Sequence, residues 1–274
     1  MTENRLNKKL AIIGLGKMGG LLADAFVRQN LLDPADISAT VRHRDRAERL
    51  DRERPFPVHT DNKQAAAGAD IILLSVKPQT IAEVAKDIAQ VVDQNKLVIS
   101  VLASVPTGSI QALLPTGVQV IRAMPNTPCS VGMGMTVLSK GSAVDEEHIQ
   151  ITEKLFDTVG RTLVLDEKHM DAVTGLSASG PAYIYVILES LAEAGVKLGL
   201  PRDVATLLAA QTTKGAAAQV LATGAHPALL KDEVTTPAGC TIDGLLELEE
   251  GKLRVTLIKA VVKAGHRARE LYEG

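Results

Sequence analysis

The stretch KLAIIGLGKMGG, Lys9 to Gly20, decides the fold of this chain. Four apolar residues at 10–13 predict a buried strand, and Gly14, Gly16 and Gly19 follow it at the spacing G-x-G-x-x-G. Apolar residues then recur at helical spacing, so the glycines lie where a strand turns into a helix. That order is typical of a dinucleotide site: Gly14 allows the tight turn, Gly16 the approach of a pyrophosphate, and Gly19 close packing of helix on strand. The alternative, in which the glycines only permit close packing, is disfavoured by the strand before them and the helix after them.

Composition narrows the class of protein. The 274 residues correspond to one large or two ordinary domains, on a prior of about 100 to 200 residues per domain. Hydrophobic residues make up 46% and charged residues 23%, which is typical of a globular chain. A net charge of −2, with three Phe, three Tyr and no Trp, offers neither a basic surface nor stacking platforms. We therefore expect no nucleic-acid partner.

The sequence shows no targeting, membrane or metal signal. The N-terminal MTENRLNKK has no apolar signal region, and no apolar run approaches the roughly 18 residues that span a bilayer, so we expect a cytoplasmic protein without membrane contact. Cys129 and Cys240 lie far apart without a C-x-x-C, which argues against a disulfide framework or a zinc site. The six histidines form no ligand spacing, and we predict no metal site.

Strands and helices alternate along residues 1–165. After the glycine turn we expect strands at 37–41, 58–59, 71–75, 97–101, 119–124, 133–139 and 161–165, and helices at 62–67, 78–92, 107–114 and 146–159. This alternation predicts an α/β domain with a Rossmann-like, doubly wound parallel sheet, and a ligand across the carboxyl ends of its strands. Gly14, Lys77 and Asn126 follow predicted strands and can converge there. A solvated strand end for Lys77 and an ordinary turn residue for Asn126 are the alternatives.

The end of the second predicted strand indicates the coenzyme. An NAD enzyme usually places an acid here, about 20 residues beyond the glycine loop, to bind the adenosine ribose. Instead Thr40, Arg42 and Arg44 supply a hydroxyl and guanidinium donors that suit a 2′-phosphate, which favours NADP over NAD. Arg42 is the preferred candidate, because the charges that follow are explained by i,i+4 ion pairs on a solvated helix. The residues of those pairs are Asp45, Glu48, Arg49 and Arg52.

Residues 166–274 lack the strand pattern and predict an all-helical domain. Helical periodicity covers 170–176, 183–198, 204–221, 241–248 and 253–271, with breaks at Gly199-Leu200-Pro201 and near Gly224 and Pro227. Small residues permit close contact between these helices, and apolar residues on more than one helix face indicate burial against a partner. We expect an obligate homodimer through residues 166–274.

Two segments of the helical region carry a family resemblance. DAVTGLSASGPAY, Asp171 to Tyr183, and KDEVTTPAGCTI, Lys231 to Ile242, resemble the two helical-domain signatures of Δ1-pyrroline-5-carboxylate reductases. IGLGKMG, SVKP and MPNTP in the first domain are similar to the same family, so the resemblance spans nearly the whole chain. It implies NAD(P)H-dependent reduction of the cyclic imine 1-pyrroline-5-carboxylate to L-proline, the last step of proline biosynthesis. It also implies a ring of dimers built from the helical domain.

The resemblance further implies which residues bind NADP. It assigns the pyrophosphate to the glycine loop, the 2′-phosphate to the end of the second strand, the adenosine and ribose to two further segments, and the nicotinamide to one loop. In that order the residues are Ile13, Gly14, Leu15, Gly16, Lys17 and Met18; Thr40 and Arg42; Asn62, Ser75, Val76, Lys77 and Pro78; and Val101, Leu102 and Ala103. Gly19 and Asn126 complete the predicted coenzyme site.

The resemblance places the substrate on a loop of the helical domain, where backbone amides hold its carboxylate and a hydroxyl reaches its ring nitrogen. The loop residues are Val234, Thr236, Gly239, Cys240 and Thr241, and the hydroxyl is that of Thr241. Thr236-Pro237-Ala238-Gly239 departs from the usual S-P-G-G, Cys240 replaces a commoner Ala or Thr, and Glu233 replaces a frequent amide, adding a carboxylate that would repel the substrate unless it points away.

From the residues alone, this loop has two interpretations of equal weight. A helix beginning near Thr236-Pro237, or at Gly239-Cys240-Thr241, offers unpaired N–H groups to an anion. An ordinary capped helix with Pro at its first position explains the same residues. The family resemblance favours the substrate site.

Thr241 is the predicted catalytic residue. Hydride transfer from NADPH to the C=N carbon needs a hydrogen-bonding group at the ring nitrogen rather than a strong base, and the Thr241 hydroxyl can orient that nitrogen and relay a proton from water. One alternative is another reductase of the 6-phosphogluconate-dehydrogenase-like group, such as a β-hydroxyacid dehydrogenase, which would need a lysine on the long helix after Gly180; this helix has none before Lys197. A non-enzymatic NADP sensor, the other alternative, would not need the substrate loop.

Overall fold

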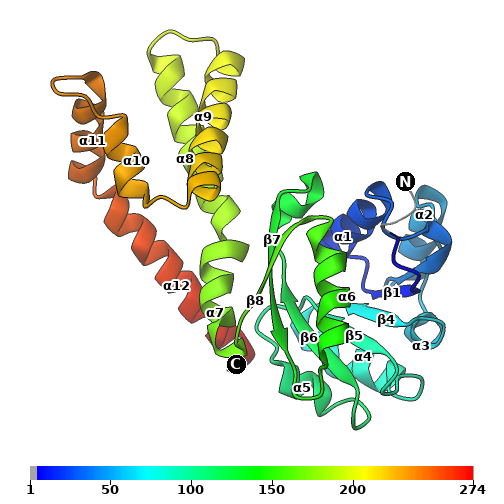
Figure 1. Cartoon of the computed structure of the whole chain (residues 1–274). Helices are drawn as coiled ribbons and strands as arrows, with labels where there is room; N and C mark the ends of the chain where they lie inside the picture. Colours follow the sequence, from blue (N-terminus) through cyan, green and yellow to red (C-terminus); the bar gives the residue numbers. More distant parts are fainter. Residues whose placement is uncertain (1–4, 274) are drawn as a thin grey trace. The chain divides into compact units, whose positions relative to one another are not determined.

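The structure, a computed structural model, describes residues 5–273 and divides into two compact units (Figure 1). One unit contains residues 5–178 together with 264–273, and the other contains residues 179–263. In the described residues the last strand ends at Val164, and every later element is a helix. The predicted order, an α/β part followed by a helical part, is therefore confirmed, while the domain boundary after residue 165 stays a prediction.

One mixed sheet organises the first unit. Its strands are β1 (Leu10–Ile13), β2 (Ile37–Thr40), β3 (Val58–His59), β4 (Ile71–Leu74), β5 (Leu97–Ser100), β6 (Gln119–Met124), β7 (Gly134–Lys140) and β8 (Gly160–Val164). Within the described chain these eight strands lie in the order β3-β2-β1-β4-β5-β6-β7-β8. That is a Rossmann-type order, in which the chain moves outward from β1 first to one side and then to the other. Ligands bind such sheets outside the carboxyl ends of the strands at this switch point, next to β1 and β4.

One strand departs from the predicted parallel sheet. β7 runs antiparallel to β6, with Met124 opposite Val137 and Ile121 opposite Lys140, whereas the other neighbouring strands of the described sheet are parallel. The reason is the short connection, which contains only the 3₁₀ helix Thr127–Val131, whereas a parallel crossover needs about a dozen residues or more. The strand pattern itself is the same for both directions, so the sequence did not distinguish them.

Alternate residues of each central strand face opposite sides of the sheet. In β1, Leu10 and Ile12 belong to one apolar cluster, and Ala11 and Ile13 belong to the other. Helices α1 (Lys17–Arg28), α2 (Arg44–Glu53) and α6 (Glu146–Asp157) cover the first cluster. Helices α3 (Asn62–Ala67), α4 (Ile81–Ile88) and α5 (Thr107–Gln111) cover the second. Because helices lie on both faces, the sheet is doubly wound, as predicted.

The ion pairs of α2 differ from those predicted. Arg44 Nε lies 3.0 Å from Glu48 Oε1, and Arg49 Nε lies 3.9 Å from Glu53 Oε1, while Arg52 donates to the Glu48 carbonyl. The expected i,i+4 spacing is present with different partners. All of these side chains are exposed, so each pair stabilises the helix by only about 0.3 to 0.5 kcal/mol.

The second unit is helical. Its elements are α8 (Gly180–Lys197), α9 (Arg202–Thr223), α10 (Pro227–Glu233), α11 (Cys240–Glu250) and the part of α12 (Leu253–Glu273) that ends at Lys263. α10 is not expected from the sequence, because a proline soon after Gly224 marks the end of one helix as readily as the start of another. Here Pro227 is the first helical residue, and the His226 ring accepts a hydrogen bond from the Ala228 N–H.

The buried part of this helical unit is small. A Cβ on Gly195 would lie 2.9 Å from the Cβ of Ala205, so α8 and α9 approach closely. Among the described residues, the buried apolar cluster of the unit consists of Ala192, Ala205 and Ala209. Large apolar side chains remain exposed, and they include Leu198 (87%), Leu207 (68%), Leu221 (66%) and Val234 (63%). This much exposed apolar surface marks an interaction surface.

Over the described part of the chain, no helix is at once long enough and apolar enough to cross a membrane.

Candidate active site

The glycine turn after β1 has the conformation that its sequence requires. Gly14 has a φ of +95°, which other residues rarely adopt, and a Cβ there would lie 2.8 Å from the Ser75 carbonyl oxygen. A Cβ on Gly19 would lie 2.6 Å from the Gly14 carbonyl oxygen, so α1 packs against the turn with no room for a side chain. Both positions need glycine for structural reasons.

Gly16 differs from the other two glycines of the motif. A Cβ there would meet nothing within 4 Å, and Gly16 caps α1 without any side-chain hydrogen bond. Among the described residues, the first-turn N–H groups of Lys17, Met18 and Gly19 have no hydrogen-bond partner. Open space beside unpaired donors at a helix N-terminus fits the pyrophosphate of a dinucleotide. The fold therefore does not need glycine at position 16, whereas an approaching ligand does.

A cavity of about 220 Å³ lies beside this turn. It is lined by residues at or just after the ends of β1, β2, β3 and β4 and by residues at the start of and within α4. The lining residues are Gly14, Thr40, Val41, Arg42, Thr60, Asn62, Val76, Thr80, Glu83, Val84 and Asp87. The structure thus brings together five residues predicted for the coenzyme from four separate segments, namely Gly14, Thr40, Arg42, Asn62 and Val76.

A chain of hydrogen bonds fixes the polar side of the cavity. The Thr40 hydroxyl donates to Asn62 Oδ1 at 2.8 Å, and Asn62 Nδ2 donates to Asp87 Oδ2 at 3.1 Å. Thr40 Oγ1 also accepts from the Gly14 N–H at 3.3 Å. Thr40 is buried and ties the glycine turn to Asn62, whereas Arg42 is exposed where it lines the cavity. Arg42 is therefore the cationic group that an entering anion can meet.

Three polar residues near the turn are not found from the sequence. Arg46 Nη2 donates to the Leu15 carbonyl at 3.0 Å, which ties α2 to the glycine loop. Glu83 and Asp87 place carboxylates in the cavity from α4, although the end of β2 carries none. No local pattern reveals these three, because only the folding of α2 and α4 beside the strand ends brings them there.

The other predicted coenzyme segments follow β4 and β5 at the same edge of the sheet. The Ser75 N–H donates to the Ile13 carbonyl at 2.9 Å, and the Val101 N–H donates to the Leu74 carbonyl at 3.0 Å. These bonds continue the sheet ladder past the strand ends and hold residues 75–78 and 101–103 in place. Lys77 is exposed, whereas Leu102 is buried and its N–H donates to Ser100 Oγ at 3.3 Å.

Asn126 has a different environment. Its Oδ1 accepts from the Met135 N–H at 2.9 Å, and its Nδ2 donates to the Ser177 carbonyl at 3.1 Å. Both ends of the amide are thus engaged, and they tie the connection between β6 and β7 to the π-helical turn Thr174–Ala178. This supports a structural role, and a contact of Asn126 with the coenzyme stays a prediction.

The predicted substrate loop lies between α10 and α11 in the helical unit. α11 begins at Cys240 with Gly239 as its N-cap, so the later of the two expected helix starts is right and Pro237 is not the first helical residue. The Gly239 N–H donates to the Thr236 carbonyl at 3.0 Å, and a Cβ on Gly239 would collide with the Thr236 hydroxyl. Over the described residues, the N–H groups of 240–242 have no hydrogen-bond partner. This helix N-terminus is therefore open to a carboxylate.

The departures from the family pattern have structural consequences. Ala238 has a φ of +56°, a left-handed conformation that costs an alanine about 1 to 2 kcal/mol and that the usual glycine would adopt freely. Glu233 is the last residue of α10 and is exposed, so solvent screens its charge. Cys240 is exposed at the first position of α11, and Thr241 follows it half-buried. Thr241 is not the cap of this helix, because Gly239 occupies the N-cap.

Comparison with known proteins adds independent information. A family profile described as "Pyrroline-5-carboxylate reductase dimerisation" matches residues 167–271, and one described as "NADP oxidoreductase coenzyme F420-dependent" matches residues 9–104. A pyrroline-5-carboxylate reductase of Arabidopsis thaliana is 42% identical, over 96% of this chain and 95% of the relative. One of Methanosarcina acetivorans is 38% identical, over 97% and 98% respectively.

Solved structures agree. The crystal structure of Plasmodium falciparum pyrroline carboxylate reductase with NADP bound matches with a TM-score of 0.89 and 30% identity, over 97% of this chain and 98% of that one. The enzyme from Coxiella burnetii matches with a TM-score of 0.87 and 34% identity, over 97% and 99%. The glycine turn and the loop before α11 fall within the residues that the two family profiles match. The chain therefore belongs to the pyrroline-5-carboxylate reductase family of NAD(P)-dependent oxidoreductases, which act in proline biosynthesis.

Proposed function

We propose that this chain reduces 1-pyrroline-5-carboxylate to L-proline with NADPH in preference to NADH. The main support is the cavity beside the glycine turn, where Thr40 ends β2 and Arg42 follows it, at the position that holds an acid in NAD enzymes. The exposed Arg42 guanidinium can form two parallel hydrogen bonds with a 2′-phosphate. The Plasmodium falciparum relative with NADP bound supports the same coenzyme.

The acids of the cavity make Arg42 more important. Glu83 and Asp87 bring negative charge to the pocket that would receive the 2′-phosphate. Without the guanidinium, a phosphate there would meet carboxylates and only neutral donors. NADH carries no 2′-phosphate, so its affinity should depend far less on this residue.

The remaining coenzyme contacts follow from the geometry of the sheet edge. The first-turn N–H groups of α1 would hold the pyrophosphate, each adding about 0.3 to 1 kcal/mol through the helix dipole. Asn62 and residues 75–78 would border the adenosine and its ribose. The backbone of residues 101–103 would lie along the nicotinamide end.

The N-terminus of α11 would hold the substrate carboxylate. The unpaired N–H groups of 240–242 suit an anion, and the exposure of Glu233 lets it remain in solvent, away from the carboxylate. When bound, NADPH supplies the hydride that reduces the C=N carbon. The Thr241 hydroxyl would donate a hydrogen bond to the ring nitrogen and keep the ring in one orientation. A hydroxyl is a poor acid, so the proton for nitrogen would come from water through Thr241, and positioning would supply most of the rate.

Assembly is part of the proposal. Residues 167–271 match the dimerisation region of the family, and the small buried cluster of the helical unit with its exposed leucines indicates a homodimer. We propose that such dimers form a ring through the same helices. Light scattering at micromolar concentration should show at least a dimer, and a monomer would refute this part. A cytoplasmic location stays a prediction from the sequence.

The two alternative functions are not supported. In the described residues of α8, lysine occurs only at the last position, Lys197, whereas a β-hydroxyacid dehydrogenase would need one inside the helix. A coenzyme sensor would not need the open N-terminus of α11. We therefore keep a single proposed function.

Coenzyme preference is tested by measuring kcat/KM for NADPH and for NADH with saturating pyrroline-5-carboxylate. One charge-assisted pair is worth about 1.5 to 3 kcal/mol, so NADPH should be favoured at least about tenfold. Equal values, or a preference for NADH, would refute the assignment of the 2′-phosphate to Arg42.

A further inference from the structure

We propose that Glu167 is a positioning residue for the loop 101–106, the loop that the proposed function puts at the nicotinamide end of the coenzyme. Glu167 follows the last strand of the sheet by only a few residues and lies far from this loop in sequence. The inference rests on the proposed place of the nicotinamide. It adds that the carboxylate of Glu167 holds the loop in its binding conformation.

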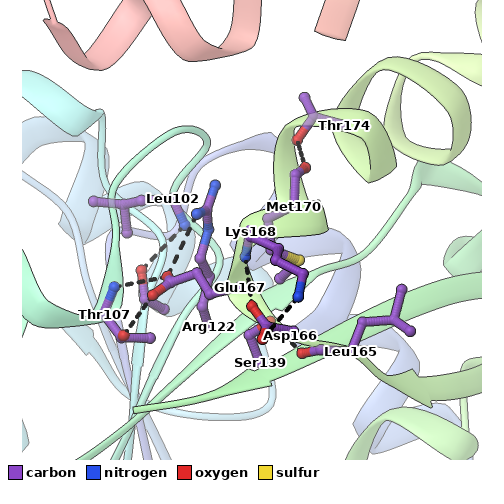
Figure 2. A network of polar contacts seen from close by, with 11 residues as sticks. Leu102, Thr107, Arg122, Ser139, Leu165, Asp166, Glu167, Lys168, Met170 and Thr174 are labelled. Carbon is purple, nitrogen blue, oxygen red and sulfur yellow. Dashed lines mark hydrogen bonds and ion pairs between the residues drawn. The ribbon is translucent and has the colours of Figure 1, made fainter. Parts of the chain in front are cut away.

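Glu167 contacts the loop end directly. Oε1 accepts from the Thr107 N–H at 2.8 Å, and Oε2 accepts from the Thr107 hydroxyl at 2.7 Å. Figure 2 shows this carboxylate between Thr107 and Arg122. Thr107 is the first residue of α5, so both bonds fix the point at which the loop enters its helix. Because Thr107 donates two hydrogen bonds to the same carboxylate, the orientation of that carboxylate is fixed as well.

A buried arginine makes the carboxylate hard to move. Arg122 Nη1 lies 3.4 Å from Glu167 Oε1, and the Arg122 side chain is only 3% exposed. In the described structure, its Nε and Nη2 have no hydrogen-bond partner. Glu167 therefore supplies a counter-charge to a buried guanidinium, and moving it away would remove that compensation.

The loop is anchored by Leu102 and Val105, which are buried in the apolar core, but the backbone between them is strained. Ser104 has a φ of +67° although it is not glycine, and its buried hydroxyl has no partner among the described residues. Such strain persists only where surrounding contacts impose it. The loop residues Ser104 and Pro106 also border a cavity of about 340 Å³, which Arg122 and Glu167 line as well. The two hydrogen bonds from Thr107 to Glu167 therefore act together with the buried Leu102 and Val105 to maintain the strained conformation.

The residues just before and just after Glu167 are fixed by hydrogen bonds. The Leu165 N–H donates to the Leu138 carbonyl at 2.9 Å, and the Ser139 hydroxyl donates to the Leu165 carbonyl at 2.7 Å. Asp166 then caps the 3₁₀ helix Glu167–His169 by accepting from the Lys168 N–H, which also lowers the pKa of the Asp166 carboxyl. The sheet thus fixes the position of Glu167. Glu167 in turn fixes the end of the loop through its hydrogen bonds with Thr107.

A positioning role predicts a selective defect in binding. Loss of the carboxylate should weaken ligands that reach the nicotinamide end, while the adenosine end, formed around Thr40 and Asn62, should be unaffected. Adenosine 2′,5′-bisphosphate contains only the adenosine end of NADP, so it is the matched probe. A merely structural role for Glu167 would weaken both ligands together.

The experiment measures dissociation constants for NADPH and for adenosine 2′,5′-bisphosphate on the full chain. Glu167→Ala should weaken NADPH about tenfold, the equivalent of one charge-assisted hydrogen bond, with less than a twofold change for the bisphosphate. Thr107→Val, which removes only the hydroxyl bond, should show a smaller defect of the same kind, and Thr107→Ser should restore affinity. Glu146→Ala is the control variant. It also removes a carboxylate from an ion pair, but this pair, with Lys140, is exposed and lies at the end of β7.

The outcomes are distinct. Equal weakening of both ligands, or no weakening of NADPH, in Glu167→Ala would overturn the positioning role. If Glu167→Ala fails to fold, the two dissociation constants are compared in the same way for Thr107→Val and Thr107→Ser. Equal weakening of both ligands by Thr107→Val, or no weakening of NADPH, would then overturn the positioning role. A parent chain that binds neither ligand would instead refute the proposed coenzyme site, so the two failures are separable.

Discussion

Replacing Gly16 with alanine should weaken coenzyme binding and leave the stability of the fold nearly unchanged. The added methyl group meets nothing within 4 Å, and the φ of −83° at this position suits alanine. Losing a glycine at a compatible position stabilises by about 0.4 to 1 kcal/mol, and alanine is a poorer N-cap by a similar amount. The free energy of unfolding without coenzyme should therefore change by less than about 1 kcal/mol.

Binding should respond very differently. The methyl group would occupy the space that fits the pyrophosphate beside the first turn of α1. Displacing the pyrophosphate from two of the N–H donors at about 1.5 kcal/mol each gives roughly 3 kcal/mol, so the NADPH dissociation constant should rise about a hundredfold or more. The assay is a fluorescence titration with NADPH, paired with urea unfolding of the free protein.

Gly19→Ala is the matched control for this prediction. Its Cβ would lie 2.6 Å from the Gly14 carbonyl oxygen, so α1 must shift, and overpacking of this kind costs about 1 to 3 kcal/mol of stability. Gly16→Ala should thus lower the affinity for NADPH, whereas Gly19→Ala should lower the free energy of unfolding. A folded Gly16→Ala protein that binds NADPH as the parent does would refute the placement of the pyrophosphate.

Three further predictions concern single residues. Arg42→Ala should raise the KM for NADPH about tenfold or more with little effect on NADH, and equal effects would contradict a 2′-phosphate contact. Thr241→Ala should lower kcat about tenfold to a hundredfold without changing NADPH affinity or Tm, and Thr241→Ser should retain activity; an alanine variant with parental turnover removes Thr241 from the mechanism. The Asp145 pKa is lowered to about 2, chiefly by the His148 backbone N–H and then by the His148 ring. The unfolded value is about 3.9, so this contribution to stability is present above about pH 4 and is lost as pH falls toward 2. Urea unfolding should show this loss in the parent and not in Asp145→Asn, and identical pH dependence would contradict it.

The parts of the fold that follow from local pattern are predictable from the sequence. The strand at Leu10–Ile13 and the glycine turn were expected because a short apolar run leads directly into glycines, and Gly14 and Gly19 lie where steric limits require them. The gathering of Gly14, Thr40 and Asn62 at one cavity also follows, because the ends of parallel strands share one edge of the sheet.

Features that depend on distant parts of the chain could not be predicted. The direction of β7 is set by the length of its connection to β6, not by its own pattern. Glu83 and Asp87 reach the cavity only because α4 packs beside the strand ends, and the contact of Glu167 with Thr107 joins residues 60 positions apart. Nothing in the sequence around Glu167 distinguishes it from a solvated acid at the start of a helix.

The most direct test of the function is a simultaneous measurement of NADPH consumption and L-proline formation by the purified chain. With pyrroline-5-carboxylate present, the account predicts equal amounts of coenzyme oxidised and proline formed, and no oxidation when the imine is omitted. A folded protein that binds NADPH but leaves it unoxidised in the presence of pyrroline-5-carboxylate would contradict it.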